Sequence, residues 1–335
     1  MRHFLTTEDW SRHELEALLS EASRLKKSPY GKTLEGKTIA LVFFNPSLRT
    51  RTSFDVGIHQ LGGHAIVLEP GKGAWPIAFD DGALMDGDEE EHVREVARVL
   101  SRYCDLIAVR AFPKFKNWEE DRQDKVLGGF AAHATVPVIN LETITHPCQE
   151  LALALTMQEK LGSLQGKNFL LTWTYHPKPL NTAVANSALL IASKLGMNVT
   201  MLCPTKEYAL DPRYMKAAEA FTREAGTTFR MTHDPDEAYK GAQMVYAKSW
   251  GALPYFGRWE PEKPIRDAHK HFIVDQRKMD LTDGAYFSHC LPVRRNIKVT
   301  DEVIDSAKSL VIDEAENRLH VQKAVMEHLA ARAKQ

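Results

Sequence analysis

Hydrophobic positions change their spacing repeatedly along this chain. Short runs of apolar or β-branched residues, typical of buried strands, occur in the first half at 38–43, 65–68, 106–109 and 136–140. Between these runs, apolar residues recur three and four positions apart, as on one face of a helix. The helices that this spacing predicts cover residues 50–61, 89–103 and 118–132. Asp88 and Glu91 have the spacing of a capping box for the second of them.

The second half repeats this alternation. The strands expected there cover residues 168–173, 198–202, 244–246, 272–274, 286–288 and 310–312. A helix begins near Pro147, and residues 314–333 are helical in pattern. Alternating strands and helices predict an α/β protein with two doubly wound parallel-sheet domains, whose ligands bind at the carboxyl ends of the strands.

Two long helices are expected to join these domains. The helix near Pro147 leads from the first domain into the second, and the C-terminal helix leads back. The predicted first domain therefore comprises residues 1–146 and 315–335, and the second comprises residues 147–314.

Composition narrows the classes of function. The chain has 335 residues, enough for two domains, and a formal net charge of −1, which argues against nucleic acid or an anionic membrane as a partner. No apolar run approaches the roughly 20 residues that span a bilayer, and residues 1–4 do not open a signal peptide. The 4 cysteines are scattered without metal-ligand spacing, which favours reduced thiols in a cytoplasmic protein.

Residues 31–38 match the phosphate-binding P-loop pattern, but the neighbouring elements are in the wrong order. A P-loop follows a strand and opens a helix, whereas this segment follows a lysine-rich helix end and precedes a predicted strand. We interpret it as a solvated turn. The chain has no Gly-x-Gly-x-x-Gly segment, which argues against a dinucleotide-dependent dehydrogenase built on the same alternation of elements.

A candidate anion site follows the first predicted strand. Residues 45–54 read Asn-Pro-Ser-Leu-Arg-Thr-Arg-Thr-Ser-Phe, a turn that leads into a helix. The first N–H groups of a helix attract anions, Ser47 and Thr50 add hydroxyl donors, and Arg49 adds a planar guanidinium that fits phosphate oxygens. The simpler interpretation is a capped helix with a solvated basic face.

Polar residues that suit the same chemistry follow other predicted strands. They are Arg110 after 106–109, His146 and Gln149 after 136–140, Cys290 after 286–288 and Arg318 after 310–312. Each alone has an ordinary alternative, such as a helix cap or a solvated basic residue. Their repetition at successive strand ends predicts a site for a phosphorylated small molecule whose carbonyl group is attacked.

Three motifs together resemble the carbamoyl-phosphate signature of the aspartate/ornithine transcarbamylase family. They are Ser-x-Arg-Thr-Arg at 47–51, His-Pro-x-Gln at 146–149 and His-Cys-Leu-Pro at 289–292, and the resemblance runs from about residue 5 to 329. It implies a carbamoyl-phosphate site formed by Ser47, Leu48, Arg49, Thr50, Trp75, Arg110, His146, Gln149, Cys290, Leu291 and Arg318. The catalytic members of this set would be Arg49, Thr50, Arg110, His146 and Cys290.

The resemblance also implies an assembly. The catalytic unit of the family is a homotrimer with sites shared between subunits, and Trp75 would reach into the site of a neighbouring subunit. Neither a metal ion nor an organic cofactor is expected.

The expected second substrate follows from a departure within the family. Ornithine-specific members carry an Asp and a Ser-Met-Gly segment, whereas residues 245–254 here contain Lys248 and neither feature. This pattern is similar to members that act on N-acylated ornithine. For these, the resemblance implies substrate contacts through Glu142, Asn181, Lys248, Leu291 and Arg294. The loop at 173–181 is similar to their proline-rich loop, which threads a knot.

Two further residues are singled out by this branch of the family. Glu90 corresponds to a glutamate of acetyl-specific members, where succinyl-specific members have proline; like-charge repulsion would exclude a succinyl carboxylate. The alternative is that Glu90 is one of several acidic residues at a helix start. Lys298 matches a lysine that is carboxylated in the acetyl-specific relatives, although an ordinary surface lysine is the simpler interpretation.

The expected reaction transfers the carbamoyl group of carbamoyl phosphate to the δ-amine of N-acetyl-L-ornithine. The products would be N-acetyl-L-citrulline and phosphate, on a route to arginine. N-succinyl-L-ornithine is the alternative substrate. The alternative of a different class is a non-catalytic, transcarbamylase-like binding subunit, which should lack phosphate or carbonyl ligands that this chain has.

Overall fold

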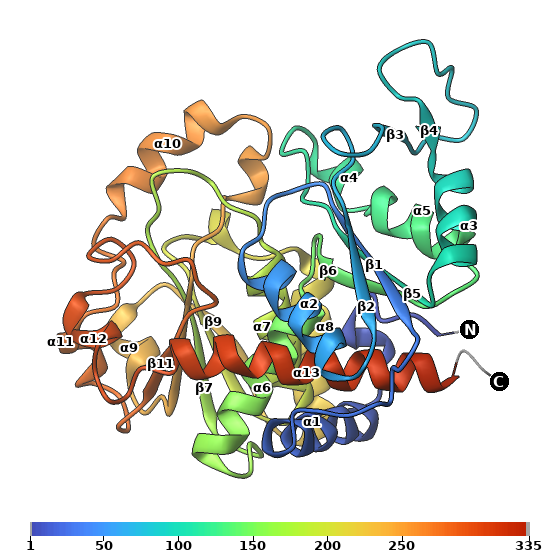
Figure 1. Ribbon diagram of the computed structural model, residues 1–335. Coiled ribbons are helices and arrows are strands. Elements are labelled where there is room, and N and C mark those ends of the chain that lie inside the picture. Colours follow the sequence, from blue (N-terminus) through green and yellow to red (C-terminus); the bar gives the residue numbers. More distant parts are fainter. Residues whose placement is uncertain (1, 333–335) are drawn as a thin grey trace. The chain divides into compact units, whose positions relative to one another are not determined.

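The computed structural model describes residues 2–332 (Figure 1). The chain is divided into two compact units. Unit 1 comprises Met1–Lys114, Glu119–Cys148 and Asn317–Gln335, and unit 2 comprises Phe115–Trp118 and Gln149–Glu316. Residue 1 and residues 333–335, which belong to the predicted first domain, lie outside the described residues. The domain limits expected from the sequence, 1–146 with 315–335 and 147–314, stay a prediction.

A four-stranded parallel sheet forms the centre of unit 1, with the strand order β2-β1-β5-β6. Its strands are β1 (Thr38–Phe43), β2 (His64–Leu68), β5 (Leu106–Arg110) and β6 (Val138–Glu142). The register places Phe43 opposite Arg110, and Arg110 opposite Glu142 after a register shift. The carboxyl ends of three strands therefore lie together, where parallel sheets commonly bind ligands.

Helices cover this sheet because its strands are almost entirely apolar. The helices of unit 1 are α1 (Arg12–Lys27), α2 (Arg49–Gln60), α3 (Val93–Tyr103) and α5 (Lys125–His133). A separate two-stranded parallel sheet pairs β3 (Ile77–Ala78) with β4 (Glu91–His92). One core is formed by α3 and α5 against β1 and β5. Helix α2 approaches the C-terminal helix at an angle, and Gly57 allows close contact with it (Figure 1).

Unit 2 has a five-stranded parallel sheet with the order β11-β10-β7-β8-β9. Its strands are β7 (Asn168–Trp173), β8 (Asn198–Leu202), β9 (Phe229–Thr232), β10 (Met244–Lys248) and β11 (Tyr286–Ser288). Its helices are α7 (Ala183–Lys194), α8 (Pro212–Ala225), α9 (Pro235–Tyr239), α10 (Trp259–Ala268), α11 (Gln276–Met279) and α12 (Asp301–Ile304). The predicted α/β class with two parallel sheets is confirmed.

The chain passes from one unit to the other within helices. Helix α6 (Pro147–Leu161) and the C-terminal helix α13 (Val311–Arg332) each contain a boundary between the units, and so does the short α4 (Trp118–Asp121). No helix within residues 2–332 has the length and apolar character needed to cross a membrane.

The predicted strand at 310–312 is wrong. Helix α13 begins at Val311, and Asp313 and Glu314 lie in its first turn, where the positive end of the helix dipole favours acidic residues. Ile312 is 71% exposed, so this apolar run is not a strand of the core. The predicted strand at 272–274 is also wrong, because Val274 forms only an isolated bridge.

Two helix predictions need correction at their ends. The predicted helix at 89–103 begins only at Val93, where His92 accepts a hydrogen bond from the Arg94 N–H (3.3 Å). Glu91 instead pairs in β4, so the expected capping box is wrong. The predicted helix at 118–132 is split into α4 and α5, because Asp124 has a left-handed backbone (φ 51°).

Candidate active site

The first turn of α2 supplies a set of donors in unit 1. Ser47 Oγ accepts a hydrogen bond from the Thr50 N–H (3.2 Å), which orders the turn before the helix. Thr50 is buried, and its hydroxyl oxygen accepts from a guanidinium N–H of Arg318 in α13. Leu48 is exposed. The positive end of α2 and the hydroxyl groups therefore suit an anion.

Charged side chains from β5, β6, α13 and the loop before α6 lie next to this turn. We call Thr50, Arg110, Glu142, His146 and Arg318 the arginine cluster. Arg110 forms an ion pair with Glu142, and His146 Nε2 lies 3.5 Å from the same carboxylate oxygen. Burial lowers the pKa of Arg318, and the nearby charges of Arg110 and Arg49 act in the same direction. An arginine nevertheless stays protonated near neutral pH. One carboxylate therefore faces several cations, and the excess positive charge favours an anionic ligand.

A hydrogen-bonded loop holds His146 at the start of α6. The buried Asn140 amide donates to Leu5 O (2.9 Å), Thr143 Oγ1 (3.1 Å) and Thr145 Oγ1 (3.2 Å). The Thr143 N–H donates to Thr145 O (2.9 Å), which closes the turn. These bonds leave the loop between β6 and α6 little freedom, so the position of the imidazole is well defined.

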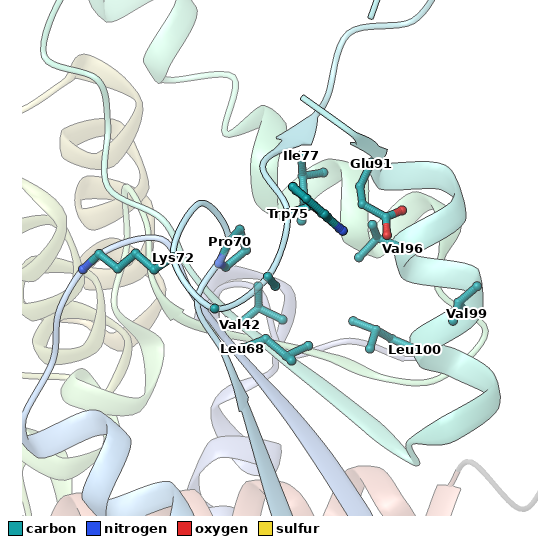
Figure 2. Close-up of a pocket in the computed structure, with 12 residues that line it drawn as sticks. Val42, Leu68, Pro70, Lys72, Trp75, Ile77, Glu91, Val96, Val99 and Leu100 are labelled. Atoms are coloured by element: carbon teal, nitrogen blue, oxygen red, sulfur yellow. The ribbon is translucent and has the colours of Figure 1, made fainter. Parts of the chain in front are cut away.

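Trp75 lies outside the arginine cluster. It lines an apolar cavity of about 560 Å³, whose walls include Leu68, Val96 and Leu100 but no member of the cluster. Figure 2 shows the indole beside Ile77 and Glu91. The side chain is 65% exposed. Within its own chain, Trp75 therefore does not lie beside the arginine cluster, where carbamoyl phosphate is expected.

Glu90 also lies outside the arginine cluster, in a loop. Residues 81–90 are all exposed, and Glu90 precedes β4 rather than the first turn of a helix. The interpretation of Glu90 as a helix-start charge is therefore wrong.

A second set of basic groups lies in unit 2, and we call His176, Lys248, His289, Arg294 and Lys298 the lysine cluster. Lys298 is only 2% exposed, and its Nζ lies 3.3 Å from His289 Nε2. Burial lowers the pKa of Lys298 to about 7, and the charges of Lys248 and Arg294 add to this effect. Burial and the charges of Lys298, Arg294 and Lys248 lower the pKa of His176 to about 4. The charges of Lys248 and Arg294, which act on both of these groups, would attract a carboxylate.

Cys290 and Leu291 follow β11 and adjoin the lysine cluster in sequence. Cys290 is buried, and the Leu291 N–H donates to His289 Nδ1 (3.0 Å). Leu291 has a positive φ of 51°, an unfavourable conformation for a branched side chain. Such strain is concentrated at functional sites, which fits the predicted role of this segment. Asn181 lies before α7, where its side-chain oxygen accepts from the Ala183 N–H (3.2 Å).

Gln149 belongs to a third set of residues, also in unit 2. Its amide N–H donates to Glu314, which also accepts from the hydroxyl groups of Tyr246 and Ser288. We call these four residues the glutamate network. All are almost completely buried.

The sequence analysis did not assign roles to His176, His289 or Glu314. His289 directly precedes Cys290, and Glu314 lies four residues before Arg318, so their positions next to candidate site residues could have indicated a role. The position of His176 in the proline-rich loop is a weaker indication. Within residues 2–332, no group of three or more His, Cys, Asp or Glu side chains is arranged to hold a metal ion.

Both halves of the chain match models of one protein family. Residues 2–159 match "Aspartate/ornithine carbamoyltransferase, carbamoyl-P binding domain", and residues 179–329 match "Aspartate/ornithine carbamoyltransferase, Asp/Orn binding domain". The chain belongs to the aspartate/ornithine carbamoyltransferase family, as its motifs predicted.

Individual relatives resemble the chain over almost its full length. It is 65% identical to the N-acetylornithine carbamoyltransferase of Xanthomonas axonopodis pv. citri (strain 306), over 99% of this chain and 98% of the relative. It is 37% identical to the N-succinylornithine carbamoyltransferase of Bacteroides fragilis (strain 638R), over 95% of each. A crystal structure of acetylornithine transcarbamylase complexed with acetylcitrulline has a TM-score of 0.98 at 65% identity, covering 98% of this chain and 99% of that one.

Proposed function

We propose that this chain is an enzyme that transfers the carbamoyl group of carbamoyl phosphate to the δ-amine of N-acetyl-L-ornithine. The products are N-acetyl-L-citrulline and phosphate, and the reaction serves arginine biosynthesis. The arginine cluster carries the proposal, because it combines buried guanidinium groups with hydroxyl and helix N-terminal donors. The 65% identity with an N-acetylornithine carbamoyltransferase supports the choice of amine.

The arginine cluster binds the phosphate and polarises the carbonyl group. Arg49 and Arg318 neutralise the phosphate together with Ser47, Thr50 and the N-terminus of α2. Thr50 accepts from Arg318, which leaves its own O–H free to donate to a substrate oxygen.

The carbonyl is the electrophile of the reaction. Arg110 and His146, both held by Glu142, donate to the oxyanion that forms when the amine attacks. Preorganised donors of this kind require no metal ion or organic cofactor. Collapse of the tetrahedral intermediate expels phosphate, which accepts the proton of the attacking amine.

The lysine cluster and its neighbours bind the acylated amino acid. Lys248 and Arg294 attract its α-carboxylate, and Asn181 offers an amide to the polar acyl group. Burial and three neighbouring cations keep His176 neutral at pH 7, because they lower its pKa to about 4. A free, positively charged α-amine would be repelled by Lys248 and Arg294, whereas an acylated nitrogen carries no charge.

Three further residues bind the amino end of the carbamoyl group. Gln149, Cys290 and the Leu291 carbonyl group accept hydrogen bonds from the carbamoyl N–H groups. Glu142 takes part in binding the amine substrate through its carboxylate.

Further features of the family complete the proposal. The active form is a homotrimer in which Trp75 reaches the site of a neighbouring subunit, and its 65% exposure leaves it available for such a contact. The loop at 173–181 is threaded as a knot. Lys298 is carboxylated, and its pKa of about 7 supports this because carbon dioxide reacts with a neutral amine. Glu90 selects acetyl over succinyl substrates.

A single assay tests the proposed function. Purified full-length protein is supplied with carbamoyl phosphate and, in parallel, with ornithine, N-acetyl-L-ornithine and N-succinyl-L-ornithine. We expect kcat/KM to be far higher for N-acetyl-L-ornithine than for the other two amines. Comparable values for free ornithine would overturn the substrate assignment, and no transfer to any of the three would overturn the activity.

A further inference from the structure

Glu314 is a buried carboxylate surrounded by hydrogen-bond donors. It is 1% exposed and lies in the first turn of α13. One carboxylate oxygen accepts from Gln149 and from the Tyr246 hydroxyl (3.0 Å), and the other accepts from the Ser288 hydroxyl. Tyr246 and Ser288 lie opposite each other on the adjacent strands β10 and β11, so the sheet itself holds the carboxylate.

This arrangement determines the orientation of the Gln149 amide. A primary amide presents two N–H donors from its nitrogen and acceptor lone pairs from its oxygen, and it can rotate by half a turn to exchange them. An ionised carboxylate only accepts hydrogen bonds. Glu314 therefore requires the nitrogen of Gln149 on its side and leaves the oxygen, Oε1, on the other. Gln149 is 2% exposed, so water offers little competition.

We propose that Glu314 is a positioning residue, which orients Gln149 so that it recognises the carbamoyl amino group. With its nitrogen occupied by Glu314, Gln149 offers Oε1 as an acceptor to the N–H of carbamoyl phosphate. An acyl phosphate that has a methyl group in place of the amino group cannot make this bond. Glu314 thereby gives the enzyme its selectivity for carbamoyl over acyl phosphates. The inference deepens the proposed function and depends on it.

The test measures binding of three probes to the full-length protein by calorimetry. Carbamoyl phosphate has the amino group, acetyl phosphate replaces it with a methyl group, and inorganic phosphate lacks the carbonyl carbon. In Glu314→Gln the new amide can donate or accept, so Gln149 is no longer held in one orientation. We expect carbamoyl phosphate to bind roughly three- to thirtyfold more weakly, the range for losing one buried hydrogen bond. Affinities for acetyl phosphate and inorganic phosphate should stay within about twofold.

A double-mutant cycle separates positioning from general packing. Gln149→Ala alone should lose the same preference for carbamoyl over acetyl phosphate, and adding Glu314→Gln should change that preference no further. Glu224→Gln makes the same chemical change at an exposed site of α8 and should leave all three affinities unchanged. Equal weakening of all three probes in Glu314→Gln, or additive effects in the double variant, would overturn the proposal.

Tyr246→Phe extends the test to a variant that keeps both Glu314 and Gln149. It removes one donor to the carboxylate, so we expect a smaller loss of carbamoyl-phosphate affinity, about two- to fivefold, with acetyl-phosphate affinity unchanged. If Glu314→Gln does not fold, an unchanged preference in Tyr246→Phe overturns the proposal. Failure of the wild-type protein to bind carbamoyl phosphate or to transfer its carbamoyl group would instead overturn the proposed function.

Discussion

The arginine cluster of unit 1 and the lysine cluster of unit 2 both concentrate positive charge, but they do so with different chemistry. In the arginine cluster, Arg110 is tied to Glu142 by an ion pair, and Arg318 is tied to a threonine hydroxyl. In the lysine cluster, burial lowers the pKa of Lys298 to about 7 and that of His176 to about 4. The guanidinium charges of the arginine cluster are fixed, whereas the charge of the lysine cluster depends on pH.

The difference follows from the side chains. A guanidinium group is delocalised and remains protonated when buried, so it supplies positive charge at any physiological pH. A lysine ammonium is a strongly hydrated point charge, and burial without an acidic partner converts it readily to the neutral amine. We infer that phosphate binding should be insensitive to pH near neutrality, whereas binding of the acylated amine should vary with pH.

The largest expected effect is loss of fixed charge from the proposed phosphate site. Arg49→Ala should weaken carbamoyl-phosphate binding by about 2–4 kcal/mol, or roughly thirty- to a thousandfold, because a charge-assisted contact in a closed site is removed. Calorimetry with carbamoyl phosphate measures this directly. Arg223→Ala, at an exposed position of α8, is the control. An Arg49→Ala variant with wild-type affinity would remove Arg49 from the site, whatever its activity.

A smaller effect is expected at Glu90, which lies outside both clusters. Removing its carboxylate should shift preference towards N-succinyl-L-ornithine, because two like charges 4 Å apart repel by about 1 kcal/mol in water and by more where water is excluded. We expect at least a roughly fivefold change in the ratio of kcat/KM values for the two acylated amines in Glu90→Ala. Glu89→Ala is the matched control in the same exposed loop. A ratio that moves by less than about twofold would show that Glu90 does not select the acyl group.

The sequence predicted the central sheets well, because strands buried on both faces have continuous apolar runs. The predictions for β1, β7, β8 and β11 match the observed strands residue for residue. Strand β9 was missed because it lies at the edge of its sheet, where Arg230 and Met231 are exposed and the apolar pattern is broken. Where burial is one-sided or partial, the pattern alone did not separate a strand from a loop.

Motifs and contacts differ in how far the sequence reveals them. Ser47, Arg110 and His146 could be predicted as candidates because each lies at or after the carboxyl end of a strand, and strand order brings these strand ends together. The glutamate network could not, since Gln149 and Glu314 are 165 residues apart and no local pattern relates them. The low pKa of Lys298 could not be predicted from the sequence either, because it depends on burial and on the neighbouring Lys248.

The pH dependence of the lysine cluster can be tested through Lys298. Its pKa of about 7 makes the neutral amine abundant at and above neutral pH, and only this form reacts with carbon dioxide to give a carbamate. Activity should therefore fall as the pH is lowered through 7, and should fall a few-fold in buffer free of carbon dioxide. Bicarbonate should restore it. Full activity in such buffer, with an unmodified Lys298 by mass spectrometry, would contradict the carboxylation.

A parallel measurement separates the two clusters. The affinity for inorganic phosphate, whose proposed site is the arginine cluster, should stay level across the same pH range once the ionisation of phosphate itself is subtracted. Lys308→Gln, at an exposed position, should keep the carbon dioxide response that Lys298→Gln loses. If phosphate affinity follows the same pH profile as activity, the contrast between fixed and titratable charge is wrong.

The smallest expected effect concerns the packing that holds the arginine cluster together. A methyl group at Gly57 in α2 would lie 3.2 Å from Lys323 Cγ of α13, tighter than ordinary contact, whereas one at Gly128 in α5 would meet nothing within 4 Å. Lys323 cannot easily yield, because its ammonium donates to Gln60 Oε1 (2.8 Å) and Pro29 O (3.0 Å). Gly128→Ala should therefore stabilise the protein by about 0.5–1 kcal/mol through helix propensity.

Gly57→Ala should lose that gain to the contact with Lys323. Because α2 carries Thr50 and α13 carries Arg318, a slight separation of the two helices should also weaken carbamoyl-phosphate binding, by roughly two- to threefold if part of one hydrogen bond is lost. Denaturant unfolding and calorimetry on both variants measure the two effects. Equal stabilisation by the two substitutions, with unchanged affinity in each, would mean that helix packing does not set the geometry of the arginine cluster. The geometry of this cluster would then depend on its ion pair and hydrogen bonds alone.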